Sequence, residues 1–141
     1  MPTLNGLITI TRPGANIITV SGNSSATLGS VIVVSSGSTV GISGLTIANG
    51  SANSGGGIYN SGALTVSRST LSGNSASNQG GGIYNNSGAL TVQDSTFSTN
   101  STTTADGGGI YSSGGTLTVD YSTFSGNIST GSQHRNRADD D

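Results

Sequence analysis

The run Gly55-Gly56-Gly57-Ile58-Tyr59 occurs three times in this chain, at residues 55–59, 80–84 and 107–111. Each copy precedes a strand pattern with Leu-Thr-Val, and then a Leu or Phe three residues before an Asn. The copies begin 25 and 27 residues apart (80 − 55 and 107 − 80). A period in this range is typical of a solenoid, in which one structural unit stacks on the next. It therefore predicts a repeat architecture rather than a domain with one central core.

Aligning the three copies places like residues in columns. The apolar columns are Ile58, Ile83 and Ile110; Leu64, Leu90 and Leu117; Val66, Val92 and Val119; and Leu71, Phe97 and Phe124. Thr separates the Leu and Val columns, at the outward position of a strand with a period of two. Weaker copies precede them, with Val40-Gly41-Ile42 in the Leu-Thr-Val place and with Ile8-Thr9-Ile10 and Thr19-Val20-Ser21-Gly22-Asn23 in a first coil. Like residues are expected to stack from coil to coil.

These columns predict an all-β fold, a right-handed single-stranded parallel β-helix of the pectin-lyase-like type. We expect about five three-sided coils over residues 1–132, with weak coils at 5–54 and clear repeats at 55–79, 80–106 and 107–132. Right-handed winding follows the usual hand of parallel crossovers. Residues 133–141 are rich in charge and lack the apolar columns, so we expect a disordered tail there.

Two corners of the coil are expected to depend on special residues. The Gly triplets suit positions of positive φ and close backbone approach. The column of Asn74, Asn100 and Asn127 is expected to form side-chain hydrogen bonds along the stack. Length differences between coils fall at Ser75–Gln79 and Ser101–Asp106, so we predict variable loops there.

Composition excludes several classes of function. The chain has four Arg or Lys residues, a net charge of −2 and no Cys, so no basic stripe for nucleic acid and no thiolate metal site is expected. Met1 to Gly14 lacks the pattern of a signal peptide, and no apolar run approaches the roughly 18 residues that span a bilayer. An export signal is therefore expected outside this chain.

The chain resembles a known bacterial family over about residues 5 to 131. Gly-Gly-Gly-Ile followed by Phe97-Ser98-Thr99-Asn100 or Phe124-Ser125-Gly126-Asn127 is similar to the Gly-Gly-Ala-Ile and Phe-x-x-Asn signatures of polymorphic outer-membrane protein repeats. The copy at Leu71-Ser72-Gly73-Asn74 departs from the pattern in having Leu for Phe. This resemblance implies a secreted or surface-displayed protein of the adhesin type, with the right-handed β-helix repeat.

A catalytic site is the alternative to this interpretation. Glycosidic cleavage needs two carboxyl groups about 5 to 9.5 Å apart, and Asp94 and Asp120 lie on neighbouring repeats. However, Asp94 shares a column with Arg68, which predicts an exposed ion pair instead. The repeats hold no acidic cluster for Ca²⁺, and the single His134 lies in the tail. We therefore expect no catalytic residue, no metal and no cofactor.

Two repeated surfaces are candidates for binding. Tyr59, Tyr84 and Tyr111 follow inward Ile residues and are expected to form an outward aromatic ladder, either as structural stacking or as a platform for a glycan or a partner protein. Thr files are the second candidate, because flat double Thr files can bind ice. They consist of Thr65, Thr91 and Thr118, and of Thr19, Thr46, Thr70, Thr96 and Thr123. The first file lacks Thr-x-Thr within one strand, since Ser67, Gln93 and Asp120 take the second position.

Together these patterns predict a non-catalytic structural or adhesive β-helix segment at a bacterial surface. Its partner would be a surface glycan or a host or neighbouring protein, and its location extracellular or at the outer membrane. The alternative is a fragment of a carbohydrate-active β-helix, a polysaccharide lyase or glycoside hydrolase, whose catalytic residues lie outside this segment. Uncapped coil ends also predict end-to-end self-association.

Overall fold

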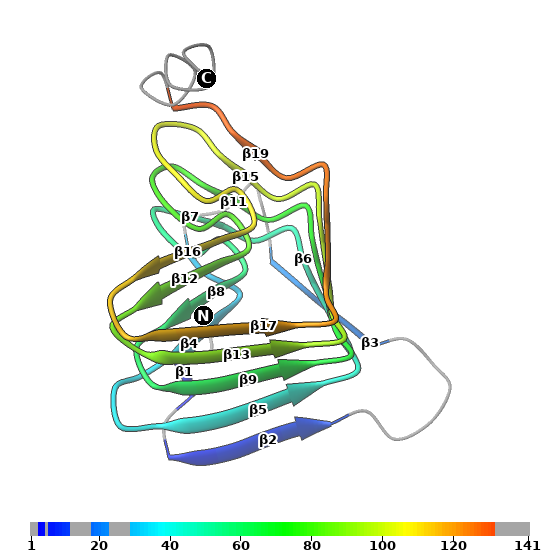
Figure 1. Ribbon diagram of the computed structural model, residues 1–141, viewed down its shortest axis with the longest axis vertical. Coiled ribbons are helices and arrows are strands. Elements are labelled where there is room, and N and C mark those ends of the chain that lie inside the picture. The colour runs from blue at the N-terminus through cyan, green and yellow to red at the C-terminus, as the bar shows by residue number, and fades with distance from the viewer. Residues whose placement is uncertain (1–2, 5, 12–17, 23–28, 132–141) are drawn as a thin grey trace.

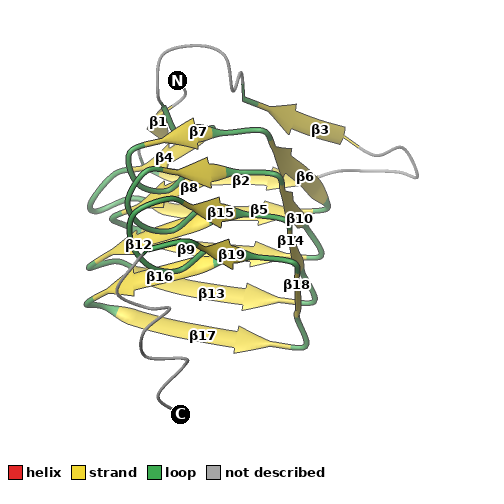
Figure 2. Cartoon of the chain, turned by 90° about the horizontal axis from the view of Figure 1, so that it is seen from above, coloured by secondary structure: helices red, strands yellow, loops and turns green. Residues whose placement is uncertain are grey.

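A computed structural model describes residues 3–4, 6–11, 18–22 and 29–131 of the chain. Every regular element in these ranges is a β-strand, and the strands form four parallel sheets that run along a solenoid (Figures 1 and 2). The expected tail at 133–141, and Asn23 of the expected first coil, lie outside the described residues. The predicted all-β parallel solenoid is confirmed.

The four sheets are named here in the order in which the chain visits them. Sheet A contains β1 (Thr3–Leu4), β4 (Ile32–Val34), β8 (Ile58–Asn60), β12 (Ile83–Asn86) and β16 (Ile110–Ser113). Sheet B contains β2 (Leu7–Thr11), β5 (Thr39–Ser43), β9 (Ala63–Ser67), β13 (Ala89–Gln93) and β17 (Thr116–Asp120). Sheet C contains β3 (Ile18–Ser21), β6 (Leu45–Ala48), β10 (Thr70–Ser72), β14 (Thr96–Ser98) and β18 (Thr123–Ser125). Sheet D contains β7 (Ser51–Ala52), β11 (Ser75–Ala76), β15 (Ser101–Thr102) and β19 (Ile128–Ser129).

Each complete turn therefore has four strands, and the expectation of three-sided coils was wrong. The additional strands are those of sheet D, only two residues long, at the start of the segments expected to be variable loops. Strands β4 to β19 make four complete turns, and β1 to β3 make a partial first turn. The expected five coils thus correspond to four full turns and one partial one.

The predicted columns are confirmed by the register of the strands. Leu64 pairs with Leu90 and Leu90 with Leu117, and the three Val residues two positions later pair in the same way. The weaker copy aligns too, with Val40 opposite Leu64 and Ile42 opposite Val66. Their side chains point inward and are almost completely buried in the inner turns. Stacking like side chains builds one continuous core that no single turn could close.

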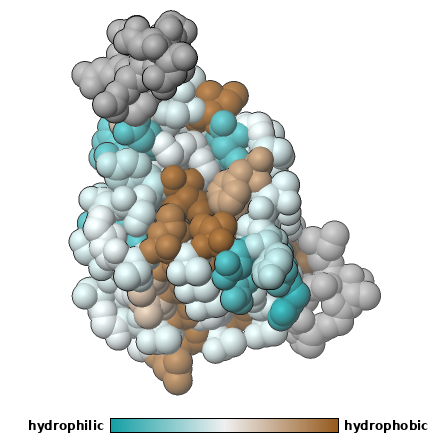
Figure 3. Space-filling model, viewed as in Figure 1, coloured by the Kyte–Doolittle hydropathy of each residue, from teal (hydrophilic) through white to brown (hydrophobic). Residues whose placement is uncertain are grey.

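The last turn presents its core residues at the end of the solenoid. Leu117 is 44% exposed, whereas Leu90, one turn earlier, is 1% exposed. Phe124 stacks on Phe97 with ring centroids 4.8 Å apart, yet it is 44% exposed while Phe97 is fully buried. Apolar side chains also gather in the middle of the face shown in Figure 3. Within the described part of the chain, no further coil covers the outer side of Leu117 and Phe124.

The Gly triplets occupy the corner before sheet A, as predicted. Gly55, Gly80 and Gly107 have φ of 68°, 66° and 71°, in the left-handed region that favours glycine. A Cβ on Gly82 would lie 2.5 Å from the carbonyl oxygen of Gly109 on the next turn. The triplets thus allow the turns to stack at backbone contact.

Two Asn ladders fill inner corners of the coil. Asn74 Nδ2 donates to Asn100 Oδ1 at 3.0 Å, and Asn100 Nδ2 donates to Asn127 Oδ1 at 2.9 Å, as the sequence predicts. A second ladder, which we did not predict, lies at the corner that leads from sheet A to sheet B. There Asn60 Nδ2 donates to Asn85 Oδ1 at 2.7 Å. In both ladders, the buried amide of one Asn is hydrogen-bonded to the Asn at the equivalent position of the next turn.

Candidate functional site

The three tyrosines of the repeat lie side by side on the outer face of sheet A. The rings of Tyr59 and Tyr84 have centroids 5.2 Å apart and are tilted by 46°. Those of Tyr84 and Tyr111 have centroids 5.8 Å apart and are nearly parallel, at 9°. All three side chains are half-buried. The predicted outward aromatic ladder is therefore present, whereas its role in binding stays a prediction.

The ladder is held in place from both sides of the strand. Ile58, Ile83 and Ile110 precede the tyrosines and point into the core, which turns each ring outward. Asn86 Nδ2 donates to the Tyr59 hydroxyl at 2.8 Å, from the neighbouring strand β12. The rings are thus fixed in spacing by the pairing of β8, β12 and β16.

A stack of loops forms a wall beside the ladder. These loops follow sheet D, at residues 53–55, 77–79 and 103–106, and we call them the loop stack. Asn78 Nδ2 donates to Asn53 Oδ1 at 3.2 Å, and the Thr104 hydroxyl donates to Asn78 Oδ1 at 3.0 Å. Backbone bonds repeat the same register, with Asn78 N donating to Asn53 O at 2.8 Å. The loops predicted to vary in length are therefore held in register over three turns.

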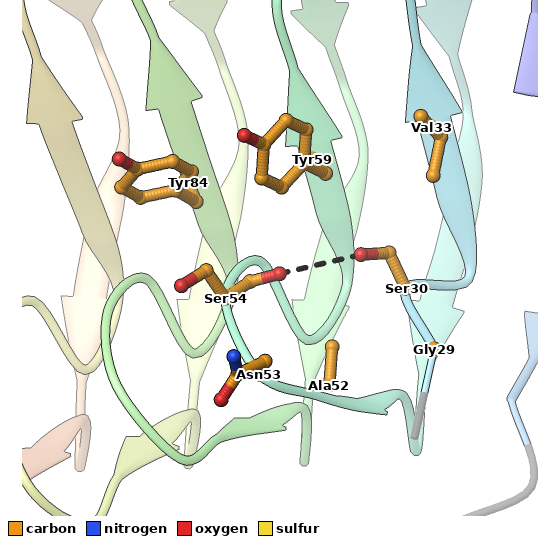
Figure 4. Close-up of a pocket in the computed structure, with 8 residues that line it drawn as sticks. All are labelled: Gly29, Ser30, Val33, Ala52, Asn53, Ser54, Tyr59 and Tyr84. Carbon is orange, nitrogen blue, oxygen red and sulfur yellow. Dashed lines mark hydrogen bonds between the residues drawn. The ribbon is translucent and has the colours of Figure 1, made fainter. Parts of the chain in front are cut away.

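A pocket of about 450 Å³ opens where the ladder ends. Figure 4 shows Val33, Tyr59 and Tyr84 on successive strands along one side, with Asn53 and Ser54 of the loop stack opposite. Val33 pairs with Tyr59 and holds the ladder position on β4. Because Val has no ring, the face of Tyr59 that a fourth ring would cover borders the pocket instead. The pocket therefore lies beside Val33, the residue in the ladder position on β4.

The lining of this pocket is polar but carries no charge. Its residues are Gly29, Ser30, Val33, Ala52, Asn53, Ser54, Tyr59 and Tyr84. The Ser30 hydroxyl donates to the Ser54 carbonyl oxygen over a long 3.4 Å (Figure 4). Neither Asn53 Nδ2 nor the Ser54 hydroxyl has a hydrogen-bond partner among the described residues. These groups can bind hydroxyl groups of a neutral ligand.

The comparison with known families agrees with this architecture. The family model for a right-handed beta helix region matches residues 7–139, nearly the whole chain. The chain belongs to the right-handed β-helix family. No curated protein and no solved structure matches it. The match supports the predicted hand of the β-helix and does not specify a ligand or an activity.

The carboxylates of this β-helix are not arranged with Arg68 as predicted. Arg68 Nη2 donates to the Ser43 hydroxyl at 2.9 Å on the preceding turn, and no salt bridge to Asp94 is found within the described residues. Arg68 and Asp94 both have positive φ, at 46° and 49°, at the corner between sheets B and C. The predicted cross-coil ion pair was wrong, because the guanidinium extends toward the previous turn instead of the next one. Asp94 and Asp120 are both exposed to solvent.

The Thr files are present in the predicted register. Thr65, Thr91 and Thr118 pair along sheet B, and Thr70 and Thr96 pair along sheet C. Position 41 interrupts the first file, because Gly41 pairs with Thr9 and Thr65. The hydroxyl array is thus regular on sheet C and interrupted on sheet B.

Among the described residues of the β-helix, no group of three or more His, Cys, Asp or Glu side chains is placed to hold a metal ion. None of their elements is a helix long and apolar enough to cross a membrane.

Proposed function

We propose that this chain is a non-catalytic β-helix segment that presents a repeated binding surface at the outside of a bacterial cell. The observation that carries this proposal is the register of the ladder and the loop stack. Tyr59 and Tyr84 are spaced by strand pairing, and Asn53 and Asn78 by side-chain and backbone hydrogen bonds. A surface that repeats at each turn favours ligands that also repeat or extend along the axis.

The surface location and adhesive role rest on the repeat motifs. The Gly-Gly-Gly-Ile and Phe-x-x-Asn signatures resemble those of polymorphic outer-membrane proteins. An adhesive segment needs rigidity more than chemistry, and inner ladders such as Asn74–Asn100 supply rigidity to this segment. A surface glycan or a host or neighbouring protein would be the partner.

The enzymatic alternative places its catalytic residues outside this segment, and within the segment it would have to use Asp94 and Asp120. These carboxylates lie on neighbouring turns, where Asp94 N donates to Asp120 O at 3.1 Å. A hydrolase or lyase would release reducing or unsaturated sugars, and Asp94→Asn would abolish that release. Such an enzyme would need these two exposed carboxylates to act together on one bond.

One experiment separates the two functions. The purified chain is incubated with immobilised glycans and with intact bacterial and host cells, and bound protein and soluble sugar products are measured together. We expect binding without sugar release, weakened by Tyr84→Ala and unchanged by Asp94→Asn. Sugar release that is lost in Asp94→Asn would overturn the proposal in favour of the enzyme, and binding to none of these surfaces would overturn the adhesive role.

A further inference from the structure

We propose that the pocket at the end of the tyrosine ladder binds one ring of a neutral glycan, stacked on Tyr59 in the position that a fourth tyrosine would occupy. This inference rests on the proposed binding function and specifies where the ligand sits and what its chemistry is. It depends on three features: a free aromatic face, a polar wall and an uncharged lining.

The free aromatic face belongs to Tyr59, because the ladder position on the neighbouring strand β4 holds Val33 instead of a tyrosine. Tyr84 is covered on both sides, by Tyr59 and by Tyr111, at 5.2 and 5.8 Å. Tyr59 has a neighbouring ring on one side only, because its partner on β4 is Val33 (Figure 4). The negative face of an aromatic ring attracts polarised C–H groups, and the flat apolar face of a pyranose presents several of them. A sugar ring can therefore replace the missing tyrosine.

The polar wall of the pocket consists of Ser30, Asn53 and Ser54. It lies where the hydroxyl groups of a sugar ring stacked on Tyr59 would point. Asn53 uses Oδ1 to accept from Asn78, which leaves its Nδ2 group able to donate. The Ser54 hydroxyl is without a partner among the described residues, and Ser30 makes only the 3.4 Å bond to the Ser54 carbonyl oxygen. Hydroxyl and amide groups of this kind fix the orientation of a ligand in a small-molecule pocket.

The lining also selects among ligands. The eight residues that border the pocket include no Arg, Lys, Asp or Glu, so nothing in the lining compensates a buried carboxylate or sulfate group. An aromatic side chain of a partner protein would cover Tyr59 equally well, but it would form no hydrogen bonds with the Asn53 amide and the Ser54 hydroxyl, whereas a sugar can form them. Both points favour a neutral sugar over an acidic sugar or a protein side chain.

The volume and position fit a chain end or a single branch. The pocket is open to solvent and has a volume of about 450 Å³, within the range of about 300 to 1,000 Å³ for small-molecule sites. Tyr84 also borders the pocket, so a second sugar unit can contact the next ring along the ladder. We infer that affinity comes from one ring stacked on Tyr59 and from weaker contacts along the axis.

The test uses the full chain and a panel of immobilised oligosaccharides, neutral ones built from hexose and N-acetylhexosamine units and acidic ones containing uronic or sialic acid. Val33→Tyr is the decisive variant, because it supplies the missing ring and fills the pocket while extending the existing stack. We expect it to abolish binding of the neutral glycans. Tyr59→Ala is expected to weaken binding about tenfold or more, since it removes the stacking face.

A matched control sits on the neighbouring sheet. Thr91→Val changes an outward residue of sheet B, away from the pocket and the ladder. It is expected to bind neutral glycans as the unchanged chain does. Circular dichroism melting curves verify that every variant is folded, and Val33→Tyr keeps the test valid if Tyr59→Ala fails to fold.

Each other result overturns the inference. Glycan binding that survives Val33→Tyr would place the ligand elsewhere and would leave the adhesive function intact. Preference for acidic glycans would contradict the uncharged lining. Binding to an array of aromatic peptides but not to glycans would make a protein side chain the occupant, again without contradicting an adhesive role. Sugar release by the unchanged chain, by contrast, would overturn the proposed function itself.

Discussion

Asn74 donates its side-chain amide to Asn100 Oδ1 at 3.0 Å, and both side chains are fully buried. The same oxygen accepts from the backbone N of Asn74 at 3.1 Å. Asn100 in turn donates to the Leu71 carbonyl oxygen and to Asn127 Oδ1, both at 2.9 Å. The Asn100 side chain thus joins the preceding turn, which holds Leu71 and Asn74, to the following turn, which holds Asn127.

Replacing Asn100 by Ala is expected to lower the free energy of unfolding by about 3 kcal/mol or more. The substitution leaves the Asn74 amide and the Leu71 carbonyl oxygen buried without their partner, and each such group costs about 1 to 3 kcal/mol. Urea unfolding followed by circular dichroism measures the change.

Asn78→Ala is the matched control for this substitution. Asn78 also takes part in an amide ladder, donating to Asn53 Oδ1 at 3.2 Å, but its side chain is exposed. Water can replace the lost bonds there, so a change below about 1 kcal/mol is expected. Equal losses for the two variants would show that burial of the inner ladder is not what stabilises the solenoid.

A methyl group on Gly82 is expected to destabilise the stack of turns. Its Cβ would lie 2.5 Å from the Gly109 carbonyl oxygen and 3.1 Å from a ring carbon of Phe97. Backbone atoms cannot move aside cheaply, so Gly82→Ala should cost about 1 to 3 kcal/mol in thermal or urea unfolding. An unchanged midpoint would contradict the close stacking of the triplets.

Gly41 provides the opposite case. A Cβ there would meet only the Thr9 side chain, at 3.9 Å, and the position lies on an outward file between Thr9 and Thr65. Glycine within a strand costs about 0.5 to 1 kcal/mol, and β-branched residues favour strands. Gly41→Thr is therefore expected to raise the unfolding midpoint, and a lowered midpoint would contradict the register assigned to β5.

The sequence predicts the core of this fold well because the core is itself the repeat. Leu90 and Phe97 could be assigned inward positions from three aligned copies alone. The number of strands in each turn was harder to predict from the sequence, because the strands of sheet D have only two residues and no alternation of apolar and polar side chains. Hydrogen bonds to neighbouring turns, rather than a local pattern, make strands of Ser75 and Ala76.

The site was predictable only in part, for a related reason. The tyrosines could be identified because they recur in each clear repeat. The pocket could not, because it lies at Val33, where the ladder position holds a different residue. The turn that holds Val33 lacks a Gly triplet, so no motif marked its place in the ladder. Its Ile32-Val33-Val34 run before Ser-Ser-Gly is the signal that could have aligned it with Ile58-Tyr59-Asn60. Arg68 shows the limit of column arguments, because a shared column does not determine which neighbouring turn a long side chain reaches.

End-to-end association is expected from the exposed last turn. Val119 is 39% exposed although its counterpart Val92 is fully buried, and the outer edge of β17 has no neighbouring strand among the described residues. Open strand edges beside apolar side chains favour pairing with another chain. In sedimentation, the average mass should rise above 13.7 kDa with concentration. Val119→Lys should suppress the rise by placing a charge at this end, whereas Thr118→Lys, an outward neighbour on the same strand, should retain it. A mass of 13.7 kDa at every concentration for the unchanged chain would rule the association out.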